Sequence, residues 1–382
     1  MEAIAISLVL RLFWDVNDPR SENVRHRLSD IITIVLLAVI AGNDDYPSIV
    51  EYARDKEAFL RTFLKLPAGI PSCSTFRRVM GRLEPSQLEG VLVKWVGLFC
   101  KSLAGKQVAL DGKTLRRSFD HAWKKLGLHV VTAWCVEDEL VIAQQAVGEK
   151  SNEIPTVPSI LKTLDIKGAV VTADAMNCQK KTADTIVAGG GDYILGVKDN
   201  QPTLEKQVAG LMNEALLEGF EGIEHSKSVT YDRAHGREEI RRVYASSELV
   251  RYVGERANWP GLKSIIMVIS ERKETGKPPT VERRYYISSL PADDAERLGK
   301  LIRGHWEIEN AQHWCLDTQF REDESRVRAG HGDENLAVMR RIALNLLKRD
   351  KTVKVGIHSK RLKAGRNDRY LLKLLTQGVD AI

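Results

Sequence analysis

The sequence has 382 residues, of which 43% are hydrophobic and 28% charged, so it is long enough for two or three domains and is not disordered. Its longest apolar run, IITIVLLAVIA at 31–41, has 11 residues and falls well short of the roughly 20 that cross a bilayer, which excludes a membrane span. The formal net charge is +6, and the five cysteines include no CxxC pair, so neither a disulfide framework nor a thiolate zinc site is indicated.

The first predicted unit is a helical N-terminal domain over 1–104, a candidate for DNA binding. Its opening AIAISLVL has no basic residue before it and no cleavage motif after it, so we expect a cytoplasmic protein. Apolar residues then recur at three- and four-residue spacing, in segments separated by loops such as LPAGIPS. Within them, GIPSCSTFRRVMGRL resembles the turn and second helix of a helix-turn-helix capped by Ser72 or Ser74, although an ordinary structural helix is the favoured interpretation.

The middle of the chain alternates strands and helices. Between 105 and 204 the patterns predict three strands, a helix, a strand, a helix and a strand, which indicates an α/β core with a mixed sheet and helical crossovers. A β-rich insertion over 205–292 interrupts this order, and we expect it to leave the core sheet and return to it as a mainly β module. Helices carrying a candidate catalytic Glu follow over 293–350, and a basic segment over 351–382 ends the chain.

Two strands of this core end in an aspartate. In QVALDGKTL, Asp111 shares a strand face with Ala109, and in AVVTADA, Asp174 shares a face with Val170 and Thr172. Neighbouring strand ends can bring carboxylates together, which repulsion disfavours unless a cation lies between them. For either Asp alone a turn or cap residue is the commoner interpretation, and for the pair the two interpretations have equal weight.

A third carboxylate comes from a helical wheel drawn on AERLGKLIRGHWEIENAQHWCLD. With Leu298 at zero, Glu309 falls at about 20°, inside the apolar stripe, and Glu307 at about 180°. The wheel therefore predicts that Glu309 points into the protein and Glu307 into solvent. A buried carboxylate needs a compensating partner, and the stripe offers His305 and His313 but no Lys or Arg. A metal ion shared with the two aspartates would compensate it.

Three carboxylates are hard oxygen ligands suited to Mg²⁺ or Mn²⁺. Two such ions about 4 Å apart can activate a water or a 3′-hydroxyl and stabilise the leaving oxygen, which is the chemistry of phosphodiester cleavage and transfer. The alternative is a zinc hydrolase on His305, Glu309 and His313, which share one helix face at i, i+4 and i+8. That alternative is weaker because it leaves the two aspartates unexplained.

Six stretches carry a resemblance to a known family: ALDGKTLRRS, KSNEIPTVPSILKTLDIKGAVVTADAMNCQKKTA, GDYILGVKDNQPTL, HGREEIRR, RYYISS, and IRGHWEIENAQHWCLDTQFREDESRVR with the later NLAVMRRIALNLLK. From about residue 20 to 375 the chain resembles the H-repeat-associated proteins, a family of bacterial insertion-sequence transposases with an Asp-Asp-Glu triad. The resemblance implies a ribonuclease-H-like core with a β-rich insertion. It assigns the catalytic, metal-binding triad to Asp111, Asp174 and Glu309, the residues reached above.

The resemblance also implies an activity and its partners. The expected function is Mg²⁺-dependent cleavage and strand transfer at the ends of an insertion sequence, with two metal ions. The partners would be double-stranded DNA, namely terminal inverted repeats and target, and a second copy of the chain during synapsis, in the nucleoid of a bacterial cytoplasm. Many relatives are remnants of once-mobile elements, so a catalytically silent DNA-binding protein is the alternative, and metal-dependent nicking would separate the two.

Basic side chains concentrate near the C-terminus. Between 340 and 373, twelve Lys or Arg face two Asp, a local charge of +10 that leaves −4 for the rest of the chain. Leu and Ile at helical spacing interleave them, which indicates a folded basic surface able to neutralise phosphates, with a solvated helix face as the equal alternative. The candidate DNA contacts are Arg361, Lys363 and Arg366 there, and Lys113, Arg116, Lys198, Asn200, His235, Arg237 and His305 elsewhere.

Some of these candidates have competing interpretations. His235 and the following arginine lie at a predicted turn of the insertion, where a plain charged hairpin tip is equally expected. Lys198 and Asn200 follow a core strand and would either position a phosphate or cap the next helix. Trp306 and Trp314 flank the predicted Glu309 helix, where we expect packing rather than base stacking.

Overall fold

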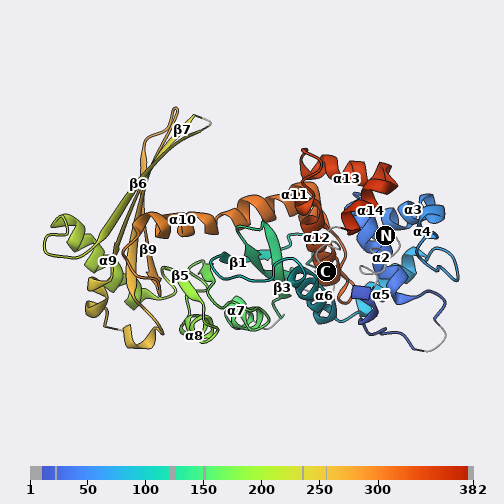
Figure 1. The fold of residues 1–382 in the computed structure, drawn as a ribbon, viewed down its shortest axis with the longest axis horizontal. Coiled ribbons are helices and arrows are strands. Elements are labelled where there is room, and N and C mark those ends of the chain that lie inside the picture. Colours follow the sequence, from blue (N-terminus) through green and yellow to red (C-terminus); the bar gives the residue numbers. More distant parts are fainter. Residues whose placement is uncertain are drawn as a thin grey trace.

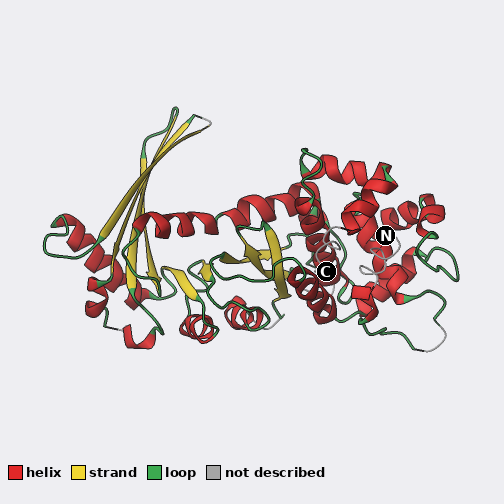
Figure 2. Cartoon of the chain, in the orientation of Figure 1, coloured by secondary structure: helices red, strands yellow, loops and turns green. Residues whose placement is uncertain are grey.

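The computed structural model describes residues 11–21, 24–119, 126–148, 152–234, 236–254 and 256–376, and it is elongated, with helices gathered at one end and a long sheet extending to the other (Figure 1, Figure 2). The helices before the sheet are α2 (Leu28–Ile40), α3 (Tyr46–Asp55), α4 (Glu57–Leu60), α5 (Cys73–Arg82) and α6 (Pro85–Gly97). Those after it are α10 (Ala295–His305), α11 (Trp314–Gln319), α12 (Gly332–Arg349), α13 (Ile357–Arg366) and α14 (Asp368–Thr376).

The two ends of the chain fold together as one helical body, made of α2–α6 and α12–α14. Helix α12 runs through its centre and packs against α2, α5, α6 and the sheet strand β3 (Leu140–Ala146). The apolar run in α2 is explained by this packing, because all of its residues except Ser29 are buried. The predicted cap is also found, since the Ser72 hydroxyl accepts a hydrogen bond from the Thr75 backbone at the start of α5. Two exposed arginines, Arg77 and Arg78, follow on that helix.

The predicted mixed sheet is confirmed. The nine strands of the described chain are β1 (Gln107–Thr114), β2 (His129–Cys135), β3, β4 (Val170–Ala173), β5 (Asp192–Val197), β6 (Ser226–Ala234), β7 (Arg237–Ser246), β8 (Ser264–Glu274) and β9 (Thr280–Ser288). They lie in the order β3-β2-β1-β4-β5-β9-β8-β7-β6. Strand β4 pairs in parallel with β1 and β5, and every other pairing is antiparallel.

The insertion differs from its prediction in one respect. It is mainly β, but it does not leave the core sheet, because β9 pairs antiparallel with β5 from Ile194–Ser288 to Val197–Tyr285 and so continues the sheet. The exposed edge of β5 would otherwise leave backbone groups unpaired, which explains why the insertion joins there. Its first element is helical, α9 (Pro202–Leu217). The hairpins β6–β7 and β8–β9, called the arm below, project beyond the rest of the molecule (Figure 1).

Helices cover both faces of the sheet. Helix α10 lies along one face and contacts β1, β4, β6 and β7, whereas α7 (Glu153–Leu161), α8 (Lys180–Ala188) and α9 cover the other (Figure 1). Helix α10 approaches closely at Gly304, where a Cβ atom would lie 2.4 Å from Gln107 Oε1. Within the described ranges, no helix combines the length and apolarity that a membrane crossing requires.

Candidate active site

The two aspartates lie side by side on adjacent strands. The parallel register pairs Leu110 of β1 with Ala173 of β4, so Asp111 and Asp174 occupy the next level of the sheet together. The predicted adjacency is therefore confirmed, and it follows from the β1–β4 pairing.

Hydrogen bonds show which face the aspartates occupy. The Gln107 amide donates to Thr172 Oγ1 at 2.9 Å and to the Leu301 carbonyl of α10 at 2.7 Å. The Thr172 hydroxyl also lies 3.3 Å from His305 Nδ1 on the same helix. Because side chains two apart on a strand share a face, Asp111 and Asp174 point towards the α10 side of the sheet.

Glu309 reaches this place by a route that the wheel did not predict. Helix α10 ends at His305, and a π-helical turn, η3 (Ile308–His313), carries Glu309 before α11 begins. Ile308 and Gln312 are buried there, whereas Glu309 is exposed, so the predicted burial of Glu309 is wrong. The physical reason is the wide turn, which breaks the 100° spacing that the wheel assumes. Glu307 is exposed as predicted.

Electrostatics link the three carboxylates. Burial, then the negative charges of Asp174 and Glu309, raise the pKa of Asp111 to about 8. Burial also raises the pKa of Asp174, with a further contribution from the charge of Glu153. Partial desolvation of the Glu309 carboxyl, whose side chain remains exposed, and the charge of Asp174 raise its pKa against the opposing charge of Arg284. Like charges held together without a matching cation are the arrangement that a divalent ion stabilises.

A hydrogen-bonded relay behind Asp174 was not predicted from the sequence. The backbone N–H and side-chain amide of Asn177 donate to Asp174 Oδ1 at 3.2 and 3.0 Å, and the amide also donates to Glu153 Oε2 at 2.7 Å. His129 Nε2 lies 2.6 Å from the other Glu153 oxygen. Glu153 stands at the start of α7, where an acidic residue is ordinary, so only the Asp-x-x-Asn spacing of 174–177 could have signalled the relay.

A cavity of about 390 Å³ opens beside Asp174 and Glu309. The core contributes Thr172, Lys198 and His305 to its walls, and the insertion contributes Arg283, Arg284, Tyr285 and Tyr286. Trp306 borders it with its ring 39% exposed and the Arg284 guanidinium 4.7 Å from the ring centroid. Trp314 is 56% exposed, so its ring is less covered than that of Trp306, which packs against Arg284.

The zinc alternative does not fit. In the part of the chain that the structure describes, Cys100, Cys135 and Asp138 form the one set of three possible ligand groups whose atoms all lie within 4.8 Å of one another. His305, Glu309 and His313 therefore do not converge, and burial lowers the pKa of His305 to about 4 and that of His313 to about 3. The Asp111, Asp174 and Glu309 oxygens are likewise too widely spaced to meet this limit together.

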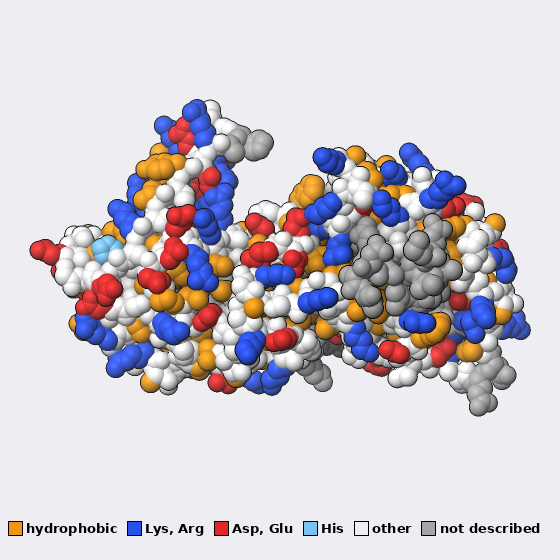
Figure 3. Space-filling view, viewed as in Figure 1, with side chains coloured by type: hydrophobic (Ala, Val, Ile, Leu, Met, Phe, Trp, Pro, Cys, Tyr) orange, Lys and Arg blue, Asp and Glu red, His pale blue; other side chains and the backbone are white. Residues whose placement is uncertain are grey.

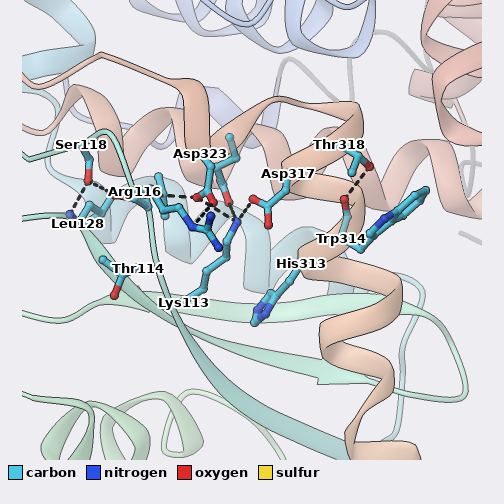
Figure 4. A network of polar contacts seen from close by, with 12 residues as sticks. Lys113, Thr114, Arg116, Ser118, Leu128, His313, Trp314, Asp317, Thr318 and Asp323 are labelled. Atoms are coloured by element: carbon cyan, nitrogen blue, oxygen red, sulfur yellow. Dashed lines mark hydrogen bonds and ion pairs between the residues drawn. The ribbon is translucent and has the colours of Figure 1, made fainter. Parts of the chain in front are cut away.

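Lys113 is a structural cation rather than a free phosphate ligand. Its ammonium contacts Asp317 and lies 3.7 Å from Glu322 and 3.4 Å from Asp323, with the side chain only 10% exposed (Figure 4). These contacts fix the end of β1 to the segment after the π-turn. His313, the last residue of the π-turn, places its Nδ1 3.4 Å from Asp111 Oδ2. The predicted DNA contact at Lys113 is therefore wrong, because three carboxylates already surround it.

The other candidate DNA contacts outside the C-terminal segment differ in exposure and in their partners. Arg116, Lys198 and Arg237 are exposed, and two of them pair with less exposed carboxylates, Arg116 with Asp323 at 3.2 Å and Arg237 with the buried Glu239 at 3.3 Å. The exposed Asn200 donates to the Ala175 carbonyl just after Asp174, so it shapes the site from its rim. His305 lines the cavity, where burial lowers its pKa to about 4, and its DNA contact stays a prediction. His235 lies outside the described residues.

The basic C-terminal segment is partly internal. Arg361 is 4% exposed, and its guanidinium donates to the Val39 carbonyl at 2.8 Å and to Asp44 Oδ1 at 2.5 Å. Its predicted DNA contact is wrong, because these groups of α2 and the following loop hold it inside the helical body. Arg340 and Arg341 are fully buried beside Glu322. Lys363 and Arg366 are exposed and stay available.

A mixed sheet with two neighbouring aspartates and a nearby glutamate is the arrangement expected of a transposase of the Asp-Asp-Glu class. Residues 104–346 match the family model described as Transposase DDE domain, and residues 10–96 match the one described as DDE_Tnp_1-associated, so the chain belongs to the DDE transposase family, whose domains use divalent metal ions. The predicted resemblance to the H-repeat-associated group is confirmed by the relatives.

Two relatives come from Escherichia coli, "H repeat-associated putative transposase YhhI" of strain K12, 36% identical over 98% of this chain and 97% of its own, and "Putative transposase YncI" of O157:H7, 34% identical over 92% and 90%. A third, "Uncharacterized protein in dhlA 3'region" of Xanthobacter autotrophicus, is 38% identical over 73% of this chain and 93% of its own. The matches to the first two span nearly the whole of both chains, so the similarity includes the helical ends as well as the sheet.

Proposed function

We propose that the chain is a metal-dependent DNA transposase that cuts and joins phosphodiester strands at the ends of an insertion sequence, with Asp111, Asp174 and Glu309 as its catalytic residues. The observation that carries this proposal is that Asp111 and Asp174 directly follow the paired residues Leu110 and Ala173 of the parallel neighbours β1 and β4, with Glu309 on the rim of the adjacent cavity. All three have raised pKa values, as expected of carboxylates that await a cation.

The donor set fits Mg²⁺ or Mn²⁺, because it consists of carboxylate oxygens and lacks thiolate. We propose two ions, since oxygens too widely spaced for one ion can still serve a pair about 4 Å apart. When bound, the ions would activate a water or 3′-hydroxyl and stabilise the leaving oxygen. The chain's own residues then hold the geometry: Asn177 orients Asp174, and Lys198 and Arg283 at the cavity offer cations to phosphate oxygens.

The ribonuclease-H-like identity of the core belongs to this proposal. It is supported by the strand order β3-β2-β1-β4-β5, in which antiparallel β1–β3 lead into the parallel neighbours β4 and β5. The two aspartates sit on the central pair of this group, and α10 covers their face.

We propose that DNA lies in the hollow between the arm and the helical body, above α10. Figure 3 shows this hollow in profile, with Lys and Arg side chains on both of its sides. Arg233 and Arg237 on the arm, and Lys363 and Arg366 on the helical body, are exposed, and we propose that they contact the duplex. A duplex held between them would pass over the carboxylates. Two copies would join paired element ends within the bacterial nucleoid.

The test uses DNA carrying the inverted repeats that flank the gene, labelled at one end, in Mg²⁺ and then in Mn²⁺. Asp111→Ala, Asp174→Ala and Glu309→Ala should each abolish cleavage and leave DNA affinity nearly unchanged, because each removes an oxygen ligand without touching the basic surfaces. The three losses should not add, since groups acting on one metal pair fail together.

Glu307→Ala is the matched control, because this glutamate is exposed two residues away and should cut normally. Loss of cleavage in Glu307→Ala, with activity kept in Glu309→Ala, would contradict the assignment of the third ligand. If the unmodified protein binds the ends but never nicks them in either metal, the catalytically silent alternative is correct instead.

A further inference from the structure

Two cysteines distant in sequence meet where the helical body joins the sheet. Cys100 lies in the non-helical connection between α6 and β1, and Cys135 is the last residue of β2. Their Sγ atoms and a carboxylate oxygen of Asp138 all lie within 4.8 Å of one another. All five cysteines of the chain are unpaired thiols, so this pair is a dithiol.

The surroundings make this a thiolate site rather than a vacant cation site. Lys106 Nζ lies 3.8 Å from Cys100 Sγ and 2.7 Å from Asp138 Oδ2, so an ammonium group already supplies the positive charge that the cluster needs. Cys135 Sγ lies 3.5 Å from the same Asp138 oxygen. The two thiols differ in access, because Cys100 is half-buried and Cys135 is fully buried.

The pKa values of the two thiols also differ, and the more accessible Cys100 has the lower one. The hydrogen bond from Cys135 and the nearby Lys106 charge lower the pKa of Cys100, against burial and the Asp138 charge. The same hydrogen bond and burial raise the pKa of Cys135 well above its usual range. The geometry thus presents a half-buried, more acidic thiol beside a buried, less acidic partner thiol, the arrangement found in oxidation-sensitive thiol pairs.

We propose that Cys100 and Cys135 form a peroxide-responsive dithiol, which closes to an intramolecular disulfide when the protein meets a hydroperoxide. The Cys100 thiolate attacks one peroxide oxygen, the O–O bond breaks, and the leaving oxygen takes a proton to become water or an alcohol. Cys135 sulfur then attacks the Cys100 sulfenic sulfur, and the departing hydroxide takes the Cys135 proton as water. One hydroperoxide is reduced for each disulfide formed.

The disulfide would act on the junction between the two parts of the molecule. Arg349 of α12 stacks on Phe99 at 3.8 Å, and Lys348 lies 5.1 Å from the Trp134 ring, so this corner already joins the helical body to β2. A covalent bond between residues 100 and 135 would fix the connection to the strand that pairs with β1, the Asp111 strand. Oxidation would therefore restrict movement of the helical body relative to the carboxylates.

The experiment treats the full-length protein with hydrogen peroxide, blocks the remaining thiols, and maps peptides by mass spectrometry without reduction. The expected result is a linked peptide pair joining Cys100 and Cys135, which dithiothreitol separates. Oxidation that gives only sulfinic acid, or that links neither cysteine to the other, would overturn the proposal. Because this readout uses the unmodified protein, it does not depend on a variant that folds or on transposition.

A second measurement follows the rate at which iodoacetamide alkylates Cys100 at neutral pH. Lys106→Gln should slow it, because the variant lacks the ammonium charge that helps to lower the pKa of Cys100 and so has less thiolate at that position. Cys73→Ser is the matched control, because Cys73 is also half-buried and lies outside the cluster. It should leave the rate and the disulfide unchanged. Equal rates in Lys106→Gln and the unmodified protein would overturn the assigned role of the cluster.

Discussion

The buried position of Arg361 yields a prediction that separates stability from DNA binding. Arg361→Gln removes a guanidinium that is held by Asp44 and the Val39 carbonyl and lies 4.1 Å from the Phe320 ring centroid. Breaking a buried ion pair by removing one partner costs about 3–5 kcal/mol in unfolding free energy. For a domain of this size that corresponds to a fall in Tm on the order of 10 °C. Lys363 and Arg366 are exposed and should contribute little to stability.

For DNA binding the order is reversed: Lys363 and Arg366 should matter, and the buried Arg361 should not. Each phosphate contact contributes a slope of about −0.9 to log K against log salt, so Lys363→Gln with Arg366→Gln should flatten the slope by about 1.8. When salt rises from 50 to 200 mM, the fold-loss in DNA affinity should be roughly twelve times smaller for the double variant than for the unmodified protein. Thermal unfolding by circular dichroism and fluorescence anisotropy with labelled duplex measure the two effects. A normal Tm with a flattened slope in Arg361→Gln would refute the buried assignment, and an unchanged slope in the double variant would place the DNA elsewhere.

Two further predictions test the supports of the site. Asn177→Ala removes the amide that bridges Asp174 and Glu153, so cleavage or metal affinity should fall on the order of 10–100-fold with little change in DNA affinity, and equal cleavage across a Mg²⁺ titration would refute the relay. Glu322→Gln leaves the buried Arg341 without its Glu322 partner and removes one of the three carboxylates around Lys113, so it should cost about 3–5 kcal/mol in urea unfolding. The charges of Arg341 and Lys113 outweigh burial and lower the pKa of Glu322, so its contribution is present above the unfolded pKa of about 4.3 and is lost as pH falls through the lower folded pKa. A variant whose stability loss persists unchanged at the lowest pH would contradict this sign.

The aspartate pair could be predicted from sequence because the signal is local. Period-two alternation places Asp111 on the face of Ala109 and places Asp174 on the face of Thr172, and these relations hold whatever the strands pair with. The mixed sheet followed from the order of strands and helices. Which strands become neighbours is a non-local matter, and the pairing of β5 with β9 could not be read from either strand alone.

The local surplus of basic residues did not identify which of them contact DNA, because the partners that bury some of them are distant in sequence. Arg361 looks like its neighbours in a basic helix, but its partner Asp44 lies 317 positions earlier, and no local pattern announces such a pair. Lys113 stands two residues from Asp111 and suggested a phosphate contact until Asp317 and Asp323 were seen to surround it. A surplus of basic residues therefore predicts a basic surface, while the assignment of single side chains to it requires the tertiary contacts.

The π-turn gives the proposed third ligand, Glu309, a different position from the one that the helical wheel predicts. Along α10 the buried stripe includes Leu298 and Ile302, and an unbroken α-helix would continue it through Glu309. The wide turn instead moves the buried stripe onto Ile308 and Gln312 and leaves Glu309 at its edge, beside the cavity and open to water. A glutamate sealed in the core could bind a cation only by excluding phosphate, whereas a ligand at the rim leaves coordination positions for water and DNA. The departure from helical periodicity thus suits the proposed role of Glu309 in phosphoryl transfer, and π-turns are frequent at functional sites.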